Sequence, residues 1–196
     1  MQTAVRARAP LRVSLAGGGT DIPPYPEEHG GAVLSMTINR YAYVTVEPRA
    51  DQTIEAHSYD YGTSLSYNVG NEPPFDGNLD LLKATTRRLG VAMGVTAFSH
   101  CDAPPGSGLG ASSAMVAAYV GALSSLLHIP MTYYDIAALS VQIERKDLGI
   151  AGGYQDQYAC TFGGWNYIEF LKDAVVVNPL RIPDETLNEL EYSVFG

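Results

Sequence analysis

Strand-like and helix-like segments are largely separated along this chain of 196 residues. The first half is rich in β-branched and aromatic residues divided by turn residues, a pattern typical of strands. The strands that it predicts are LRVSLA (11–16), AVLSMTI (32–38), YAYVTVEP (41–48), SLSYNV (64–69) and VTAFSHC (95–101). Asn39-Arg40 lies between two of these segments at hairpin spacing, so we expect a tight turn there.

Helical patterns dominate the second half. Residues 112–128 carry apolar side chains at helical spacing, and Pro130 ends the pattern. Thr132 opens another helix, with Asp135 as its capping-box partner, and Gly149 ends it. The remaining predicted elements are a helix at 78–90 and strands at 164–170 and 174–179. This partial separation predicts an α+β fold rather than a strict alternation of strands and helices.

The balance of charge and hydrophobicity narrows the class of protein. A hydrophobic content of 46% excludes wholesale disorder. The net charge of −9 leaves no broad basic face for non-specific nucleic-acid binding, and no stretch approaches membrane-spanning length. Cys101 and Cys160 are too few for a disulfide framework, so we expect buried free thiols in a cytoplasmic protein without nucleic-acid or membrane partners.

The strongest local signal for function is PPGSGLGASSA (104–114), between a predicted strand and an Ala-rich helix. Its glycines let the backbone approach a ligand closely, and the helix N-terminus attracts anions such as phosphate. An ordinary turn with Ser112 as the N-cap is the alternative. The segment has no Lys, which excludes a Walker loop. Gly106, Gly108 and Ala111 match the dinucleotide spacing, but the strand with an acidic end that must follow is absent.

Two further segments place carboxylates beside glycines. In LRVSLAGGGTD (11–21), Asp21 is suited to accept hydrogen bonds from sugar hydroxyls, or to stabilise a turn. In IERKDLGIAGGYQDQYACTFGG (143–164), Glu144 and Asp156 are candidates for a general base or a metal ligand. The alternatives are a solvated helix face for Glu144 and an ordinary polar loop for Asp156.

Together, these three segments resemble the N-terminal domain of the GHMP small-molecule kinases over nearly the whole chain. The central piece resembles the ATP phosphate loop of that family. The flanking pieces look most like the sugar kinases of the D-glycero-D-manno-heptose 7-phosphate kinase type. These pieces are RVSLAGGGTDIPPY, GGAVLSMTINRYAYVTV and GGYQDQYACTFGGWNYIEF. The resemblance implies a ribosomal-protein-like α+β fold with a mixed or antiparallel sheet, helices on one face and a left-handed β-α-β unit.

The resemblance also implies ATP, Mg²⁺ and a set of site residues. ATP would contact Pro105, Gly106, Ser107, Gly108, Leu109, Gly110, Ala111, Ser112 and Ser113. Ser112 and Glu144 would bind Mg²⁺, Asp156 would be the catalytic base, and Arg12 would help to activate the acceptor hydroxyl. The sugar would contact Gly18, Gly19, Thr20, Asp21, Gly153 and Gln155. Ala111 stands where many relatives carry Ser.

The implied reaction is transfer of the γ-phosphate of ATP to a sugar hydroxyl, the anomeric hydroxyl of a heptose 7-phosphate or a similar sugar. Another GHMP reaction, on galactose, mevalonate or homoserine, and non-catalytic nucleotide binding are the alternatives. Family members continue into a second domain, whereas this chain ends at ELEYSVFG (189–196). We therefore expect residues 1–196 to be the N-terminal, ATP-binding domain, truncated before the C-terminal domain, with that domain, a partner chain or a second copy covering its apolar surface.

Overall fold

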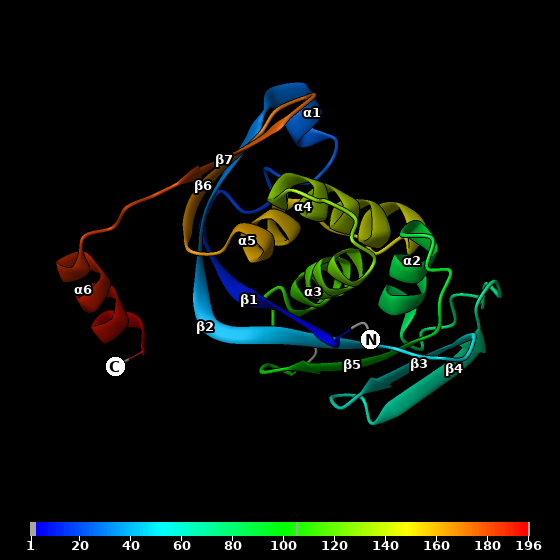
Figure 1. Ribbon diagram of the computed structural model, residues 1–196. Helices are drawn as coiled ribbons and strands as arrows, with labels where there is room; N and C mark the ends of the chain where they lie inside the picture. The colour runs from blue at the N-terminus through cyan, green and yellow to red at the C-terminus, as the bar shows by residue number, and fades with distance from the viewer. Residues whose placement is uncertain (1–2, 105, 196) are drawn as a thin grey trace.

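A mixed sheet covered on one face by helices forms the body of the molecule, as the computed structural model shows (Figure 1). The structure describes residues 3–104 and 106–195, so Pro105 lies outside the described residues. The strands are β1 (Val5–Ala16), β2 (Gly31–Pro48), β3 (Thr53–Ser58), β4 (Thr63–Asn68), β5 (Val95–Cys101), β6 (Trp165–Phe170) and β7 (Val175–Pro179). The helices are α1 (Tyr25–His29), α2 (Asp80–Arg88), α3 (Ala111–Leu126), α4 (Tyr133–Val141), α5 (Gln155–Phe162) and α6 (Asp184–Phe195), and the π-helical turn η1 (Gln142–Asp147) continues α4.

The sheet confirms the predicted α+β class. Its strands follow the order β4-β3-β5-β2-β6-β7, and β1 pairs with β2. Only β3 and β5 run parallel among the strand pairs of the described residues; the others are antiparallel. Helices α2 to α5 lie together on one side of the sheet (Figure 1), as expected. The left-handed β-α-β unit stays a prediction.

Strand β2 is one long strand, so the predicted hairpin at Asn39-Arg40 is wrong. Its first half, 31–36, pairs with β6, and its second half, 42–48, pairs with β5. Strand β1 pairs along the other edge of both halves, and β2 bends between them (Figure 1). The residues on both sides of Asn39-Arg40 pair with three strands, and this pairing keeps β2 extended against the local turn preference of Asn39-Arg40.

Helix α3 lies at the centre of the core and confirms the helix predicted at 112–128. Its Val116, Val120 and Leu123 are fully buried, and the helix packs against β1 and β2. Each fully buried side chain of this size stabilises the fold by roughly 1.5–3 kcal/mol. The core therefore fixes the N-terminus of α3, where the glycine-rich loop ends.

The capping box at the start of α4 is also confirmed. The Thr132 hydroxyl accepts from the Asp135 N–H, and the Asp135 carboxylate accepts from the Thr132 N–H. Elements β3, α1, α5 and α6 were not predicted. Of these, α6 stands apart from the body of the molecule (Figure 1). No helix in the described part of the chain has the length and hydropathy that crossing a membrane requires.

Candidate active site

The glycine-rich loop is open and strained in a way that only glycine tolerates well. Gly106, Gly108 and Gly110 have φ values of 78°, 74° and 73°, a region that L side chains rarely adopt. A Cβ atom at Gly106 or Gly108 would meet nothing within 4 Å. The glycines at these two positions thus serve the backbone conformation and leave space above the loop.

The N-terminus of α3 has a glycine where a capping side chain is usual. Its N-cap is Gly110, and no side chain caps the helix. The alternative role of Ser112 as N-cap is therefore wrong, because Ser112 lies inside the first turn and its hydroxyl donates to Glu144. An uncapped helix N-terminus leaves backbone N–H groups and the positive end of the helix dipole for an anion.

Arg12 joins the predicted base to the loop. Its Nε and Nη2 atoms donate to the two carboxylate oxygens of Asp156 at 2.7 and 2.6 Å. Its Nη1 donates to the carbonyl oxygen of Gly108 at 2.6 Å, and its backbone N–H donates to that of Leu109. A bidentate pair of this kind fixes a carboxylate in both position and rotation. Asp156 lies in the first turn of α5, so the interpretation of its surroundings as a loop is wrong.

Glu144 is a buried carboxylate rather than part of a solvated helix face. Only 1% of the residue is exposed, although Arg145 and Lys146 follow it in the sequence. Its Oε1 accepts from the Ser112 hydroxyl at 2.6 Å, and its Oε2 accepts from the Ser113 hydroxyl at 2.7 Å. A buried carboxylate needs hydrogen-bonding partners. For Glu144 these partners are hydroxyls at the start of α3, which stand 31 and 32 residues earlier in the sequence.

Gln157 is a further residue of the site that the sequence did not reveal. Its side chain is fully buried and its Nε2 donates to Oε2 of Glu144, while its Oε1 has no protein partner among the described residues. One turn of α5 therefore holds both Asp156 and the amide that orients Glu144. The only signal in the sequence was the polar triplet Gln155-Asp156-Gln157, which is also common in exposed loops.

Asp21 has a different environment from Asp156. It is fully buried, its Oδ1 accepts from the Gly19 N–H and the Gln155 side chain, and its Oδ2 accepts from the Gln155 N–H at 2.9 Å. The carboxylate thus ties the 17–21 turn to the start of α5, which agrees with the turn-stabilising alternative. A direct contact between Asp21 and a sugar stays a prediction.

One cavity of about 330 Å³ gathers the loop and both catalytic candidates. Its lining includes the side chains of Arg12, Asp156, Glu144, Ser112 and Ser113 and the loop residues Gly106, Ser107, Gly108, Gly110 and Ala111. The residues predicted to contact the sugar are absent from this lining. They are Gly18, Gly19, Thr20, Asp21, Gly153 and Gln155. The structure therefore brings together the predicted phosphate, metal and catalytic residues.

A larger and more apolar cavity, of about 860 Å³, adjoins the first. The two share Tyr61, Leu81, Met115 and Ile150. The larger cavity has further apolar or aromatic surface from Phe75, Leu79 and Tyr119. A groove that is polar at one end and apolar at the other suits a ligand with a charged tail and a flat, weakly polar body.

Within residues 3–104 and 106–195, no group of three or more His, Cys, Asp or Glu side chains is arranged to hold a metal ion. Mg²⁺ does not require such a group, because it commonly takes one or two carboxylates, substrate phosphates and water. Glu144 and Ser112 offer hard oxygen ligands in the wall of the cavity. The residues present thus fit Mg²⁺ that arrives with a polyphosphate.

Cys160 lies directly behind the loop, with its Sγ atom 3.8 Å from the carbonyl oxygen of Gly110. Burial raises the pKa of this thiol well above its ordinary value, and the negative charge of Asp156 acts in the same direction. The thiol therefore stays protonated and serves as packing. Both cysteines are free, as expected, but only Cys160 is buried, and Cys101 at the end of β5 is partly exposed.

Comparison with known proteins agrees with this fold. Residues 79–164 match the family model described as the GHMP kinases N terminal domain. This match confirms the resemblance drawn from the three segments of the chain.

The chain is similar to named sugar kinases along most of its length. It is 42% identical over 193 residues to a D-glycero-alpha-D-manno-heptose 7-phosphate kinase of Campylobacter jejuni, covering 95% of this chain and 57% of that protein. A crystal structure of a D-glycero-D-manno-heptose 1-phosphate kinase from Bacteriodes thetaiotaomicron matches with a TM-score of 0.90 and 44% identity, over 95% of this chain and 63% of that one. A galactokinase of Thermococcus kodakarensis is 28% identical over 163 residues, covering 81% of this chain and 44% of that protein. The chain thus spans less than two thirds of the length of these relatives.

Proposed function

We propose that this domain is the ATP-binding part of a sugar kinase that acts in the cytoplasm on a phosphorylated sugar, with a heptose phosphate as the first acceptor to test. The observation that carries the proposal is the position of Arg12, which holds the Asp156 carboxylate and the carbonyl of Gly108 at once. The candidate base and the candidate phosphate loop therefore face one cavity. Phosphoryl transfer depends mainly on such positioning and on neutralised charge.

The nucleotide would lie across the two adjoining cavities. Its phosphates would receive hydrogen bonds from the loop backbone and the N-terminus of α3, and the base would lie in the apolar cavity beside Tyr61 and Met115. Ser112 and Glu144 would hold Mg²⁺, which supplies positive charge to the phosphate oxygens when bound.

Asp156 would act as the general base. As the sugar hydroxyl oxygen attacks the γ-phosphorus, its proton passes to the Asp156 carboxylate, a new O–P bond forms, and the bond to the leaving oxygen of ADP breaks. Arg12 keeps the carboxylate pointing into the cavity through two hydrogen bonds. The same guanidinium offers positive charge beside the transferred group.

The choice of acceptor class rests on the relatives of this chain. Two relatives with heptose phosphates in their names are 42% and 44% identical to it. The galactokinase relative has a lower identity of 28%, so galactose is the second acceptor to test.

The test is transfer of labelled γ-phosphate from ATP to a panel of free and phosphorylated sugars. It is run with this chain and with a chain extended by the remaining length of a relative, each with an Asp156→Asn control. The proposal predicts a labelled heptose bisphosphate in at least one wild-type sample and in neither control. Binding of Mg-ATP without transfer to any sugar in both chains would favour the non-catalytic alternative.

A further inference from the structure

Beside the candidate active site, with its two adjoining cavities, lies a second cavity, of about 770 Å³, which the chemistry above does not use. It is lined by α1, by α4 with η1, by the loop 149–154 and by the turn between β6 and β7. Arg145, Ile150 and Ala151 line both this cavity and the one that holds Asp156. The two cavities therefore meet at the loop 149–154.

Positively charged side chains for which the described residues show no carboxylate or aromatic partner gather at this second cavity. Seven of the twelve Lys and Arg side chains lie against a carboxylate or an aromatic ring in the described residues: Arg6, Arg8, Arg12, Arg49, Lys83, Arg87 and Arg88. The other five are Arg40, Arg145, Lys146, Lys172 and Arg181. Three of these five, including two of the three lysines of the chain, line the second cavity.

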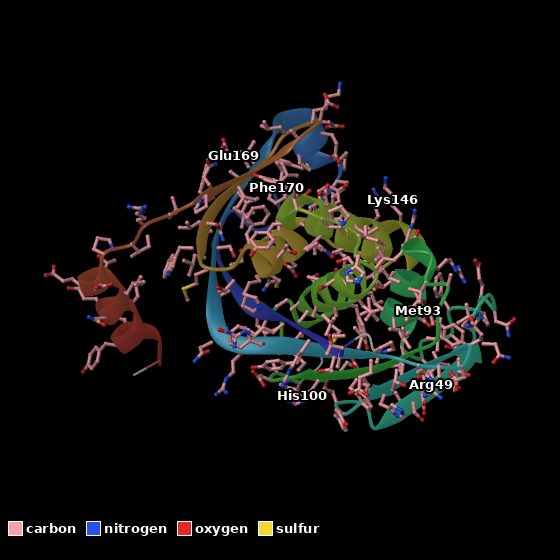
Figure 2. The ribbon with its side chains drawn as sticks, in the orientation of Figure 1. Arg49, Met93, His100, Lys146, Glu169 and Phe170 are labelled. Carbon is pink, nitrogen blue, oxygen red and sulfur yellow. The ribbon has the colours of Figure 1, made fainter. Side chains whose placement is uncertain are left out.

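The charge of this lining differs from that of the chain. The carboxylates in the lining are Glu27 and Asp173, so its formal balance is +1, whereas the chain carries −9. Tyr154 donates weakly to Glu27 at 3.4 Å. Lys146 is exposed and lies at the outer edge of the helical layer (Figure 2), in the lining of this cavity.

Arg145 shapes the boundary between the two cavities. Its Nε donates to the carbonyl oxygen of Gly153 at 2.9 Å, and its Nη1 donates to that of Ile150 at 3.1 Å. The guanidinium thus holds the loop 149–154 while its charge faces both cavities. The floor of the second cavity is apolar, with Phe170 and Tyr158 buried there in edge-to-face contact.

From these observations we infer that the second cavity binds the phosphate group that the acceptor sugar already carries. This inference rests on the proposed kinase function and names the part of the site that selects a phosphorylated acceptor. The reacting hydroxyl would lie at Asp156, the carbon chain would pass the loop 149–154, and the phosphate monoester would lie between Lys146 and Lys172. Lysine suits this role as a mobile point charge for a phosphate dianion.

The test measures binding rather than turnover, by calorimetry on this chain with Mg-ADP present. The probes are D-glycero-D-manno-heptose 7-phosphate, the same heptose without phosphate, and inorganic phosphate. The variants are the double change Lys146→Ala with Lys172→Ala, and Arg181→Ala, which removes an exposed charge outside the cavity lining.

The inference predicts that the double variant binds the heptose phosphate about tenfold more weakly, while its affinity for the free heptose is unchanged. Arg181→Ala leaves both affinities unchanged. The inference is overturned if wild type binds both heptoses equally, if the double variant keeps its affinity for the heptose phosphate, or if Arg181→Ala weakens it equally. A wild-type affinity for inorganic phosphate equal to that for the heptose phosphate would reveal a general anion site and would also overturn it.

Failure of this inference is distinguishable from failure of the proposed function. Binding of Mg-ADP is measured in the same samples. Normal binding of Mg-ADP with no discrimination between the two heptoses overturns the acceptor-phosphate site alone. Absence of Mg-ADP binding in wild type contradicts the kinase function itself and, with it, the inference.

Discussion

Two glycine-rich turns of this molecule look alike in the sequence and differ in the fold. At 106–110, Gly106 and Gly108 are open to a cavity, and Arg12 ties the loop to Asp156. At 17–21 the turn is fastened to the rest of the domain. A Cβ atom at Gly17 would lie 1.9 Å from the carbonyl oxygen of Ala32. The Thr20 hydroxyl accepts from the Ala32 N–H, and Asp21 is fully buried.

The difference separates two uses of glycine. Close packing of backbone against backbone excludes a side chain at Gly17, whereas a positive φ beside empty space excludes it at Gly106 and Gly108. Gly106 and Gly108 also line the cavity that holds Asp156, whereas Gly19, which has a positive φ beside open space as well, does not line it. The same contrast holds for carboxylates, since Asp21 accepts hydrogen bonds from the fold and Asp156 faces a cavity.

The largest expected effect is on turnover, from a change at Asp156, which lines the same cavity as the open loop at 106–110. Asp156→Asn removes the proton acceptor but keeps the size of the side chain, so turnover should fall by roughly 10²–10⁴-fold. Affinity for Mg-ADP should change little. Steady-state kinetics and calorimetry on the same preparation check both values. Turnover equal to that of wild type would remove Asp156 from the mechanism.

Substitutions that loosen the fastened turn at 17–21 should lower the free energy of unfolding. Asp21→Asn replaces a buried carboxylate that accepts three hydrogen bonds, at a cost of about 3 kcal/mol. For a chain of this size, that cost lowers Tm by roughly 6–12 °C. Gly153→Ala should act in the same direction, because its Cβ atom would lie 1.9 Å from Oδ2 of Asp21.

Thermal unfolding of both variants, followed by nucleotide titration well below Tm, checks this. We expect a lower Tm with the affinity for Mg-ADP retained. An Asp21→Asn variant with wild-type Tm but a lost affinity for a sugar acceptor would assign this carboxylate to the ligand after all.

Substitutions at the buried residues Glu144 and Gln157 test whether both contribute to metal affinity. Glu144→Gln removes the charge expected to hold Mg²⁺, and Gln157→Met removes the amide that orients it. Partners of a metal ligand typically contribute 10–100-fold in metal affinity. We expect the affinity for Mn²⁺ in the presence of ADP, followed by electron paramagnetic resonance, to fall more in Glu144→Gln than in Gln157→Met.

The matched control is Gln142→Met, which changes an exposed glutamine on the same π-helical turn. It should leave the affinity for Mn²⁺ unchanged. Equal affinities in all three variants would make Glu144 a purely structural carboxylate.

The smallest expected effects come from replacing one glycine by alanine in each of the two turns, at 106–110 and at 17–21. Gly108→Ala and Gly19→Ala each place a side chain at positive φ, beside no atom within 4 Å, so each should cost about 1–2 kcal/mol of stability. Only Gly108→Ala should weaken binding of Mg-ADP, by up to about tenfold. Equal nucleotide affinities in the two variants would show that the loop does not contact the phosphates.

Local pattern was enough to predict the glycine-rich loop, α3 and the capping box of α4, because each depends on residues close together in the sequence. Glu144 looked solvated because Arg145 and Lys146 follow it, and its burial depends on hydroxyls of α3 and an amide of α5. The extended backbone at Asn39-Arg40 likewise depends on the pairing of the residues on either side with β1, β5 and β6. Contacts of this range leave no local signal, so the resemblance to a family supplied what periodicity did not.

The most direct measurement is a titration of the isotope-labelled chain with Mg²⁺ and a non-hydrolysable ATP analogue, followed by backbone amide resonances. We expect the amides of residues 106–113 to shift progressively with nucleotide, whereas those of residues 17–20 stay in place. Unmoved resonances throughout 106–113 at saturating nucleotide would contradict the assignment of this loop as the phosphate site.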